Sequence, residues 1–251
     1  MNFTTHGNRN NKSLLFIHGL ASNADLCFKP LLAYLQDYYV IFCELDGHYG
    51  KKPKDLISVE DIIDSVESYI IREMGGSVYG ICGFSMGATL AVEILGRGNI
   101  SVNRGLLDGA ITAELGLMAL PLTWAFILGT KRIKNKKSIP KFLLDKIMGK
   151  DNKGLIEMMY PQISKETIKN ACRYIYHYKV PENLTKFSNP VLFWRGSQEP
   201  IPAKSEKKLR EYLPQMKTEV FEGMGHGKFL HEHPIEYAEK LKKFLENKIL
   251  E

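Results

Sequence analysis

A serine stands between two glycines in the stretch ICGFSMGA, residues 81–88, where an apolar, strand-like run gives way to a helix-forming one. Most serines cap helices, sit in turns or face solvent. The glycines two residues before and after Ser85 allow a tight turn that exposes the side chain between them at the end of the strand. The pattern indicates a nucleophile, although an ordinary glycine-rich turn has the same five residues.

The candidate base is a histidine near the end of the chain. A serine hydroxyl is a weak nucleophile near neutral pH, so it needs a base that removes its proton and an acid that orients the base. His226 lies in EGMGHGKF, between two glycines and directly after the last predicted strand. This loop is therefore expected to bring the imidazole over the edge of the sheet where Ser85 lies.

Two carboxylates are candidates for the orienting acid. Glu199 lies in WRGSQEP, just beyond a predicted strand, and Asp108 lies in LLDGA, at the end of the strand that follows the serine's helix. Either side chain could accept the N–H of the imidazole, and a loop can absorb the extra methylene of glutamate. We favour Glu199 and keep Asp108 as the alternative acid.

The elements that must position these residues alternate along the chain. Apolar runs predict strands over 13–19, 38–45, 77–84, 189–196 and 217–224. Helices are predicted over 24–36, where Pro30 marks either a break or a first turn, and over 86–95, 203–213 and 234–249. Ser58 with Asp61 forms a capping pair for one more. Continuous apolar strands separated by amphipathic helices indicate an α/β protein with a mostly parallel sheet covered by helices on both faces.

The alternation stops between residues 111 and 187. This part begins with an apolar run over 115–129, continues with the basic stretch TKRIKNKKSIPK and includes SKETIKNACRYIYHY, whose apolar residues have helical spacing. We interpret 111–187 as a mostly helical lid inserted into a core that comprises residues 1–110 and 188–251.

Apolar side chains of the lid are candidates for substrate binding, namely Met118, Trp124 and Phe126. At helical spacing such side chains more often form a core. The basic stretch that follows them is interpreted as a solvated face, with attraction to anionic substrates or lipid headgroups as the alternative.

Five segments of the chain, in this order, resemble the α/β-hydrolase superfamily. FIHGL (16–20) resembles its His-Gly oxyanion segment, ELDGHYG (44–50) its Asp-x-x-Gly-x-Gly loop and GFSMG its nucleophile elbow, while RGSQEP and GMGHG resemble its acid and histidine loops. The resemblance implies the α/β-hydrolase fold. It also implies an oxyanion hole made by the backbone N–H groups of Leu20 and Met86.

The resemblance, together with serine at position 85, implies an acyl-enzyme route. A carboxylic ester with an apolar acyl group, or a related thioester or lactone, would be cleaved and the acyl group then released by water. Family members that open epoxides or remove halogens carry aspartate at this position. Two alternatives on the same fold remain, a ligand-binding protein with slow or absent turnover and a lyase.

The composition is that of an ordinary globular protein. Of 251 residues, 44% are hydrophobic and 25% charged, and the net charge is +6. No nucleic-acid-binding motif accompanies this charge, so we expect a small-molecule, ester-like substrate and no nucleic acid. The sequence does not indicate the oligomeric state.

Neither a leader, a membrane span nor a metal is expected. The N-terminal residues lack the apolar core of a signal peptide, and the longest apolar run is interrupted by Pro121 and shorter than the ~20 residues that cross a bilayer. The four cysteines show no C-x-x-C pairing, and the pair His231 and His233 has no further ligand cluster. We therefore expect a cytoplasmic protein with buried reduced thiols, without cofactor or metal.

Overall fold

A seven-stranded sheet forms the centre of the computed structural model, which describes residues 1–139, 150 and 154–247. In the described residues the strand order is β1-β3-β2-β4-β5-β6-β7. The bounds are β1 Asn2–His6, β2 Lys12–Ile17, β3 Tyr38–Glu44, β4 Ser77–Phe84, β5 Ser101–Asp108, β6 Val191–Gly196 and β7 Lys217–Phe221. β1 pairs antiparallel with β3, and the pairs from β3 to β7 are parallel. The predicted α/β fold with a mostly parallel sheet is confirmed.

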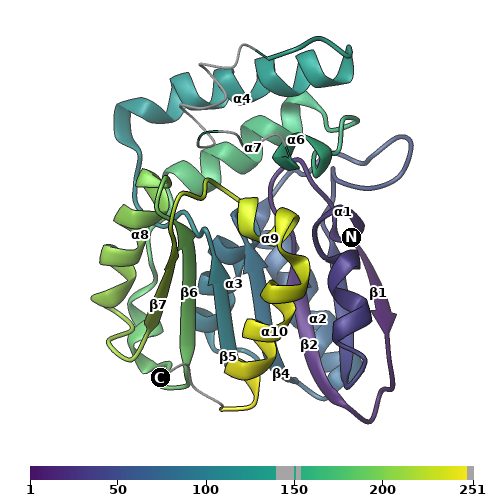
Figure 1. Ribbon diagram of the computed structural model, residues 1–251, viewed down its shortest axis with the longest axis vertical. Helices are drawn as coiled ribbons and strands as arrows, with labels where there is room; N and C mark the ends of the chain where they lie inside the picture. Colours follow the sequence, from purple (N-terminus) through teal and green to yellow (C-terminus); the bar gives the residue numbers. More distant parts are fainter. Residues whose placement is uncertain (140–149, 151–153, 248–251) are drawn as a thin grey trace.

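Helices cover both faces of this sheet (Figure 1). One face carries α1 (Ala24–Phe28), the 3-10 helix η1 (Lys29–Tyr34), α9 (Lys228–Glu232) and α10 (Pro234–Leu245). The other carries α2 (Val59–Met74), α3 (Met86–Arg97) and α8 (Pro200–Arg210). The active-site candidates follow β4, β5, β6 and β7, so they meet at one edge of the sheet.

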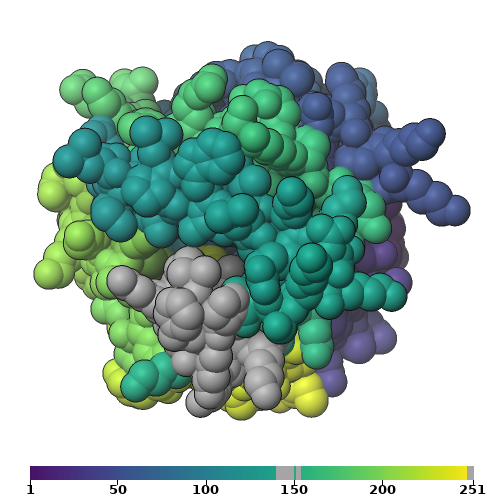
Figure 2. All heavy atoms as spheres, turned by 90° about the horizontal axis from the view of Figure 1, so that it is seen from above, coloured from purple at the N-terminus to yellow at the C-terminus, as the bar shows by residue number. Residues whose placement is uncertain are grey.

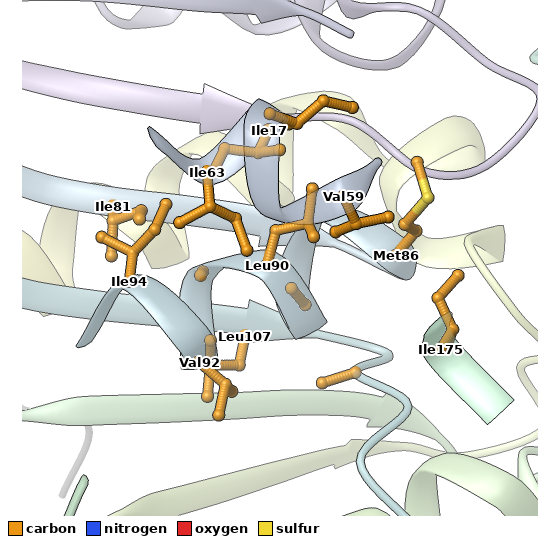
Figure 3. Packing of buried hydrophobic residues seen from close by; sticks show 14 of the residues in the cluster. Ile17, Val59, Ile63, Ile81, Met86, Leu90, Val92, Ile94, Leu107 and Ile175 are labelled. Carbon is orange, nitrogen blue, oxygen red and sulfur yellow. The ribbon is translucent and has the colours of Figure 1, made fainter. Parts of the chain in front are cut away.

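Alternate side chains of the strands enter two hydrophobic clusters. In β2, Leu15 and Ile17 belong to the cluster under α2 and α3, while Leu14 and Phe16 belong to the cluster under α10. Figure 3 shows the first cluster, in which Ile63 of α2 and Leu90 and Ile94 of α3 lie over the strands. Both faces are therefore buried, as expected of continuous apolar strands.

The predicted helix over 24–36 is divided near Pro30, one of the two roles expected for that residue. The α-helix ends at Phe28, and a 3-10 helix with Pro30 in its first turn follows. Proline has no N–H to donate to the carbonyl of Leu26, so the α-helical pattern cannot continue through it. The strand β1 and the short helix α9 were not predicted at all.

Further helices lie beyond the carboxyl ends of the strands, at the top of Figure 1. They are η2 (Gly116–Met118), α4 (Ala119–Lys134), α6 (Gly154–Glu157) and α7 (Lys165–Tyr176). The 3-10 helix η3 (Glu182–Lys186) lies instead at the other end of the sheet, where Leu184 is close to Gly96 at the end of α3. Ile168, Ala171, Cys172 and Ile175 of α7 are buried in the same cluster as α3. Lys141, the last residue of the basic stretch, lies outside the described residues. In the part of the chain that the structure describes, no helix is long and apolar enough to cross a membrane.

The first turn of α3 lies directly against the end of β2. A Cβ at Gly87 would overlap the carbonyl oxygens of Ile17 and His18, which belong to the backbone and cannot swing away. Gly87 therefore serves a close approach of helix to strand.

We expect Gly87→Ala to lower the free energy of unfolding by about 3 kcal/mol, because the added methyl group forces β2 and α3 apart. Gly129→Ala is the matched control. Gly129 lies inside α4, and its added Cβ would be 3.7 Å from Cδ1 of Ile139, an ordinary van der Waals contact. That change should raise the free energy of unfolding by up to about 1 kcal/mol through helix propensity. Urea unfolding measures both, and an unchanged midpoint in Gly87→Ala would contradict the close approach.

Candidate active site

Ser85 occupies the turn between β4 and α3 in a strained conformation. Its φ is 54° and its ψ −117°, a region that costs a residue with a side chain about 1–3 kcal/mol. The backbone N–H of Ser85 donates to the carbonyl of Asp108 (2.7 Å), which holds the turn against β5. A Cβ at Gly83 would overlap the backbone of Gly87 and Ala88. The glycines thus permit close packing, and the positive φ falls on the serine itself.

His226 lies within hydrogen-bond distance of both candidate partners. The hydroxyl of Ser85 lies 2.8 Å from Nε2, and Nδ1 lies 2.5 Å from Oε1 of Glu199. With Nδ1 donating to the carboxylate, Nε2 carries the lone pair that accepts from the hydroxyl. The ring of Phe84 stacks on the imidazole with the centroids 5.1 Å apart. The three predicted residues are therefore brought together in the order that the sequence suggested.

The acid loop and the histidine loop are tied to each other. The second oxygen of Glu199 accepts the N–H of Gly196 at the end of β6. The N–H of Gln198 donates to the carbonyl of Met224 (3.0 Å), two residues before the histidine. The side chain of Glu199 is 4% exposed and that of His226 is 21% exposed. The carboxylate is thus fixed in a buried position, and the imidazole remains accessible.

Asp108, the alternative acid, is buried beside this pair. Its carboxyl accepts a hydrogen bond from the hydroxyl of Tyr237 on α10. Burial raises the pKa of Asp108 to about 7, and the negative charge of Glu199 acts in the same direction. The acid that contacts Nδ1 of His226 is Glu199, while Asp108 adds a second titratable group close by.

The pKa of His226 is raised above its ordinary value. Burial acts to lower it, but the carboxylate of Glu199, through its charge and its hydrogen bond, and the charge of Asp108 together outweigh burial. An imidazolium at this position is thus stabilised by its surroundings.

The segment that precedes Leu20 is held by a neutral histidine. Burial and the nearby His48 lower the pKa of His18 to about 3. Its Nε2 accepts the N–H of Leu45 (3.1 Å), so the proton is on Nδ1, which donates to the carbonyl of Gly19 (2.9 Å). In a trans peptide the C=O and the N–H point in opposite directions, so this bond aims the N–H of Leu20 away from His18.

That segment lies against Ser85. A Cβ at Gly19 would be 3.2 Å from the Cβ of Ser85, a tight contact that a larger residue could make only if its neighbours shifted. Met86 is the first residue of α3, where backbone N–H groups have no partner within the helix. The N–H groups of Leu20 and Met86 thus belong to two segments that converge on Ser85.

A cavity of about 540 Å³ opens over the three side chains. Ser85, His226, Glu199 and Leu20 line it, and so do Met118 and Phe126 from the predicted lid. Trp124 does not line this cavity. It lies on the outer side of α4, 49% exposed, with the ammonium of Lys165 4.7 Å from its ring centroid. Further apolar residues line the cavity, including Leu115, Leu122, Leu155, Met158, Met159 and Ile201.

Two polar contacts around the site have no signal in the sequence. Nothing there marks the hydroxyl of Tyr237 as a partner of Asp108. His18 was part of a quoted motif, but only its burial and bonds define what it holds. Among the described residues no group of three or more His, Cys, Asp and Glu could hold a metal ion. His231 instead lies 3.4 Å from the carboxylate of Glu157.

Comparisons with known proteins agree with this fold. A family model described as the alpha/beta hydrolase family matches residues 14–240. No curated protein matches the chain.

Solved structures match nearly the whole chain. An alpha/beta hydrolase family protein from Desulfitobacterium hafniense has a TM-score of 0.88 at 23% identity, covering 97% of this chain and 100% of that one. The enol-lactonase from Burkholderia xenovorans has a TM-score of 0.76 at 17% identity, with 98% and 96% covered. A lipase-esterase related protein from Clostridium acetobutylicum has a TM-score of 0.71 at 20% identity, with 97% and 98% covered. At these identities the likeness shows the fold.

We expect the imidazole of His226 to titrate above 6.5, the ordinary histidine value. Glu199→Gln should lower that midpoint, because the imidazolium loses its hydrogen-bonded negative partner, and Asp108→Asn should lower it less. Glu211→Gln, at the exposed far end of α8, is the matched control and should leave the midpoint unchanged. NMR titration of the ring nitrogens measures all four proteins. A midpoint that responds to Asp108→Asn and not to Glu199→Gln would make Asp108 the partner.

Proposed function

Because the chain belongs to the alpha/beta hydrolase family, we propose that it is a serine hydrolase that cleaves a carboxylic ester, or a related thioester or lactone, with an apolar acyl group. The observation that carries this proposal is the pair of hydrogen bonds from Ser85 to His226 and from His226 to Glu199, 2.8 and 2.5 Å long. Such a relay is what a hydroxyl needs to act as a nucleophile near neutral pH.

In the first step, Oγ of Ser85 attacks the carbonyl carbon of the substrate while its proton passes to Nε2 of His226. The imidazolium that forms is stabilised by the carboxylate of Glu199, which also keeps Nδ1 protonated and the ring in place. The direction of the pKa shift of His226 supports this role, since it reflects surroundings that favour the charged ring.

The carbonyl oxygen becomes an oxyanion during this attack. We propose that the N–H groups of Leu20 and Met86 donate to it. Met86 opens α3, and the N-terminal end of that helix carries the positive end of its dipole, which favours negative charge. Preorganised donors of this kind contribute about 2.7–4 kcal/mol each to lowering the barrier.

In the second step, the imidazolium of His226 returns its proton to the leaving alcohol or thiol, and the acyl group stays on Ser85 as an ester. Water then attacks the acyl carbon while His226 takes its proton, and collapse of the second tetrahedral intermediate frees the acid and restores the serine hydroxyl. The 21% exposure of the histidine side chain is compatible with entry of water from the cavity.

The apolar lining of the cavity supports an apolar acyl group. Its volume of about 540 Å³ lies in the range of pockets for small organic ligands. We propose that residues 111–187 act as a lid over this cavity, to which they contribute Met118 and Phe126. The charged groups Glu114 and Lys204 also line it, and both are exposed.

Ser85→Ala should reduce kcat for ester hydrolysis by about 10⁶-fold, the size seen when such a nucleophile is removed. It should also abolish covalent labelling by a fluorophosphonate. Ser22→Ala is the matched control, since Ser22 is buried, lines the same cavity and bonds to the carbonyl of Met158. That variant should keep its labelling. Labelling of the wild type without turnover of any acyl ester would point to a ligand-binding protein, and ester hydrolysis retained in Ser85→Ala would remove Ser85 from the mechanism.

Glu199→Gln should lower kcat by about 10⁴-fold with little change in KM, because the amide no longer holds the imidazole in the reactive tautomer. Asp108→Asn should lower kcat less, because the Asp108 carboxyl is hydrogen-bonded to Tyr237 and Glu199 is the acid that contacts Nδ1 of His226. Steady-state kinetics on one ester compares the two variants. A larger loss in Asp108→Asn than in Glu199→Gln would contradict the assignment of the acid.

A further inference from the structure

The outer side of η2 and α4 exposes large apolar side chains. Leu117 is 97% exposed, Leu120 73%, Leu128 57% and Trp124 49%. Figure 2 looks down on this end of the molecule, where α4, in teal, runs across the face. Met118 of η2 is 56% exposed as well, and the remaining large exposed apolar residues of the described chain are scattered over separate elements. A cluster of this kind is unusual on a protein surface and marks a place of contact.

The three leucines and Trp124 form one stripe along the helix. Their positions are separated by three or four residues, which places them on the same side of α4. The next positions on this side are Lys131 and Arg132, and the exposed Lys134, Lys136 and Lys137 follow. From residue 115 to residue 139 the sequence contains no aspartate or glutamate. The stripe is thus apolar along most of its length and basic at its end.

The side of the helix that carries Leu122 and Phe126 is already occupied, because these residues line the cavity. Ile127, beside the stripe, is buried. A helix that is apolar on both sides either sits inside a protein or meets an apolar phase with its outer side. The outer stripe therefore has no role in forming the cavity.

We propose that the outer stripe of η2 and α4 docks on the surface of a lipid membrane that carries anionic headgroups. The leucines and Trp124 enter the boundary between headgroups and acyl chains, and the basic end pairs with the negative headgroups. Exposed Lys165 and Arg173 of the neighbouring α7 add charge of the same sign. Since the described residues contain no helix that could span a membrane, we propose that α4 lies on the membrane surface.

Charge argues against a second copy of the chain as the occupant. A second copy would bring an identical stripe, which has no acidic residue to pair with the basic end. An anionic membrane supplies both the apolar phase and the negative charge. The proposal does not depend on the chemistry of Ser85, because none of its residues contacts the site.

The test is co-sedimentation of the full chain with vesicles of phosphatidylcholine, alone or mixed with phosphatidylglycerol. We expect binding to the mixed vesicles that weakens at high salt and little binding to phosphatidylcholine alone. Leu120→Ser/Leu128→Ser should lower the partition coefficient at least about tenfold. Lys131→Glu/Lys134→Glu should lower it by a similar factor on the mixed vesicles.

Two matched controls separate this stripe from general effects. Ile71→Ser/Ile235→Ser removes exposed apolar side chains elsewhere. Lys186→Glu/Lys217→Glu reverses exposed charges near the opposite end of the sheet, where Lys186 precedes β6 and Lys217 begins β7. Both controls should bind the mixed vesicles as the wild type does. All variants should keep the thermal midpoint of the wild type and its activity on a water-soluble ester.

The proposal is overturned if the wild type does not sediment with the mixed vesicles, or if the α4 variants bind them as the wild type does. It is also overturned if the wild type forms a concentration-dependent dimer in place of vesicle binding and Leu120→Ser/Leu128→Ser disperses that dimer. Analytical ultracentrifugation of both proteins measures this outcome. The stripe would then belong to a second copy.

Discussion

The close approach of α3 to the end of β2 is the contact on which the geometry of the site depends. Gly87 rests on the backbone carbonyls of Ile17 and His18, and Gly19 lies close to the side chains of Ser85 and Phe84, so the proposed nucleophile and the proposed oxyanion segment are held close together. Backbone atoms cannot rotate away as side chains do, and this fixes the strained φ of Ser85. The strain is local, and the surrounding sheet supports it through the bond from Ser85 to β5.

His18 and His226 lie at this edge of the sheet, where burial acts to lower the pKa of each, yet their pKa values are shifted in opposite directions. His18, without a hydrogen-bonded carboxylate partner, is kept neutral and acts as a fixed donor to the oxyanion segment. His226 has Glu199 on one nitrogen and Asp108 nearby, and the same burial is outweighed by their charges. The sheet therefore presents His18 as a rigid donor and His226 as a candidate proton acceptor at the edge where Ser85 lies. The difference arises from the partners and not from the residue type.

Much of the fold and the centre of the site could be predicted from the sequence, because apolar alternation and glycine context are local signals. The choice between Glu199 and Asp108 could not, since both follow strands at the same edge and only the tertiary contact selects the partner of Nδ1. The side of α4 on which Trp124 lies could not be predicted either, because an almost wholly apolar helix has no polar face that sets its orientation. β1 escaped prediction since its side chains are mostly polar and exposed.

The pairing of β5 with β6 has a consequence for the order of folding. Leu106 pairs with Leu192, and the whole of the inserted segment lies between them in the sequence. Forming this pair closes a long loop, so its entropic cost is large and must be met before the contacts between the strands form. Glu199 and His226 join the sheet only through β6 and β7. During synthesis the strands up to β5 emerge first, and they carry Ser85 without Glu199 or His226. Under the proposed mechanism Ser85 becomes reactive only when the last strands have assembled, so an incomplete chain does not react with substrate.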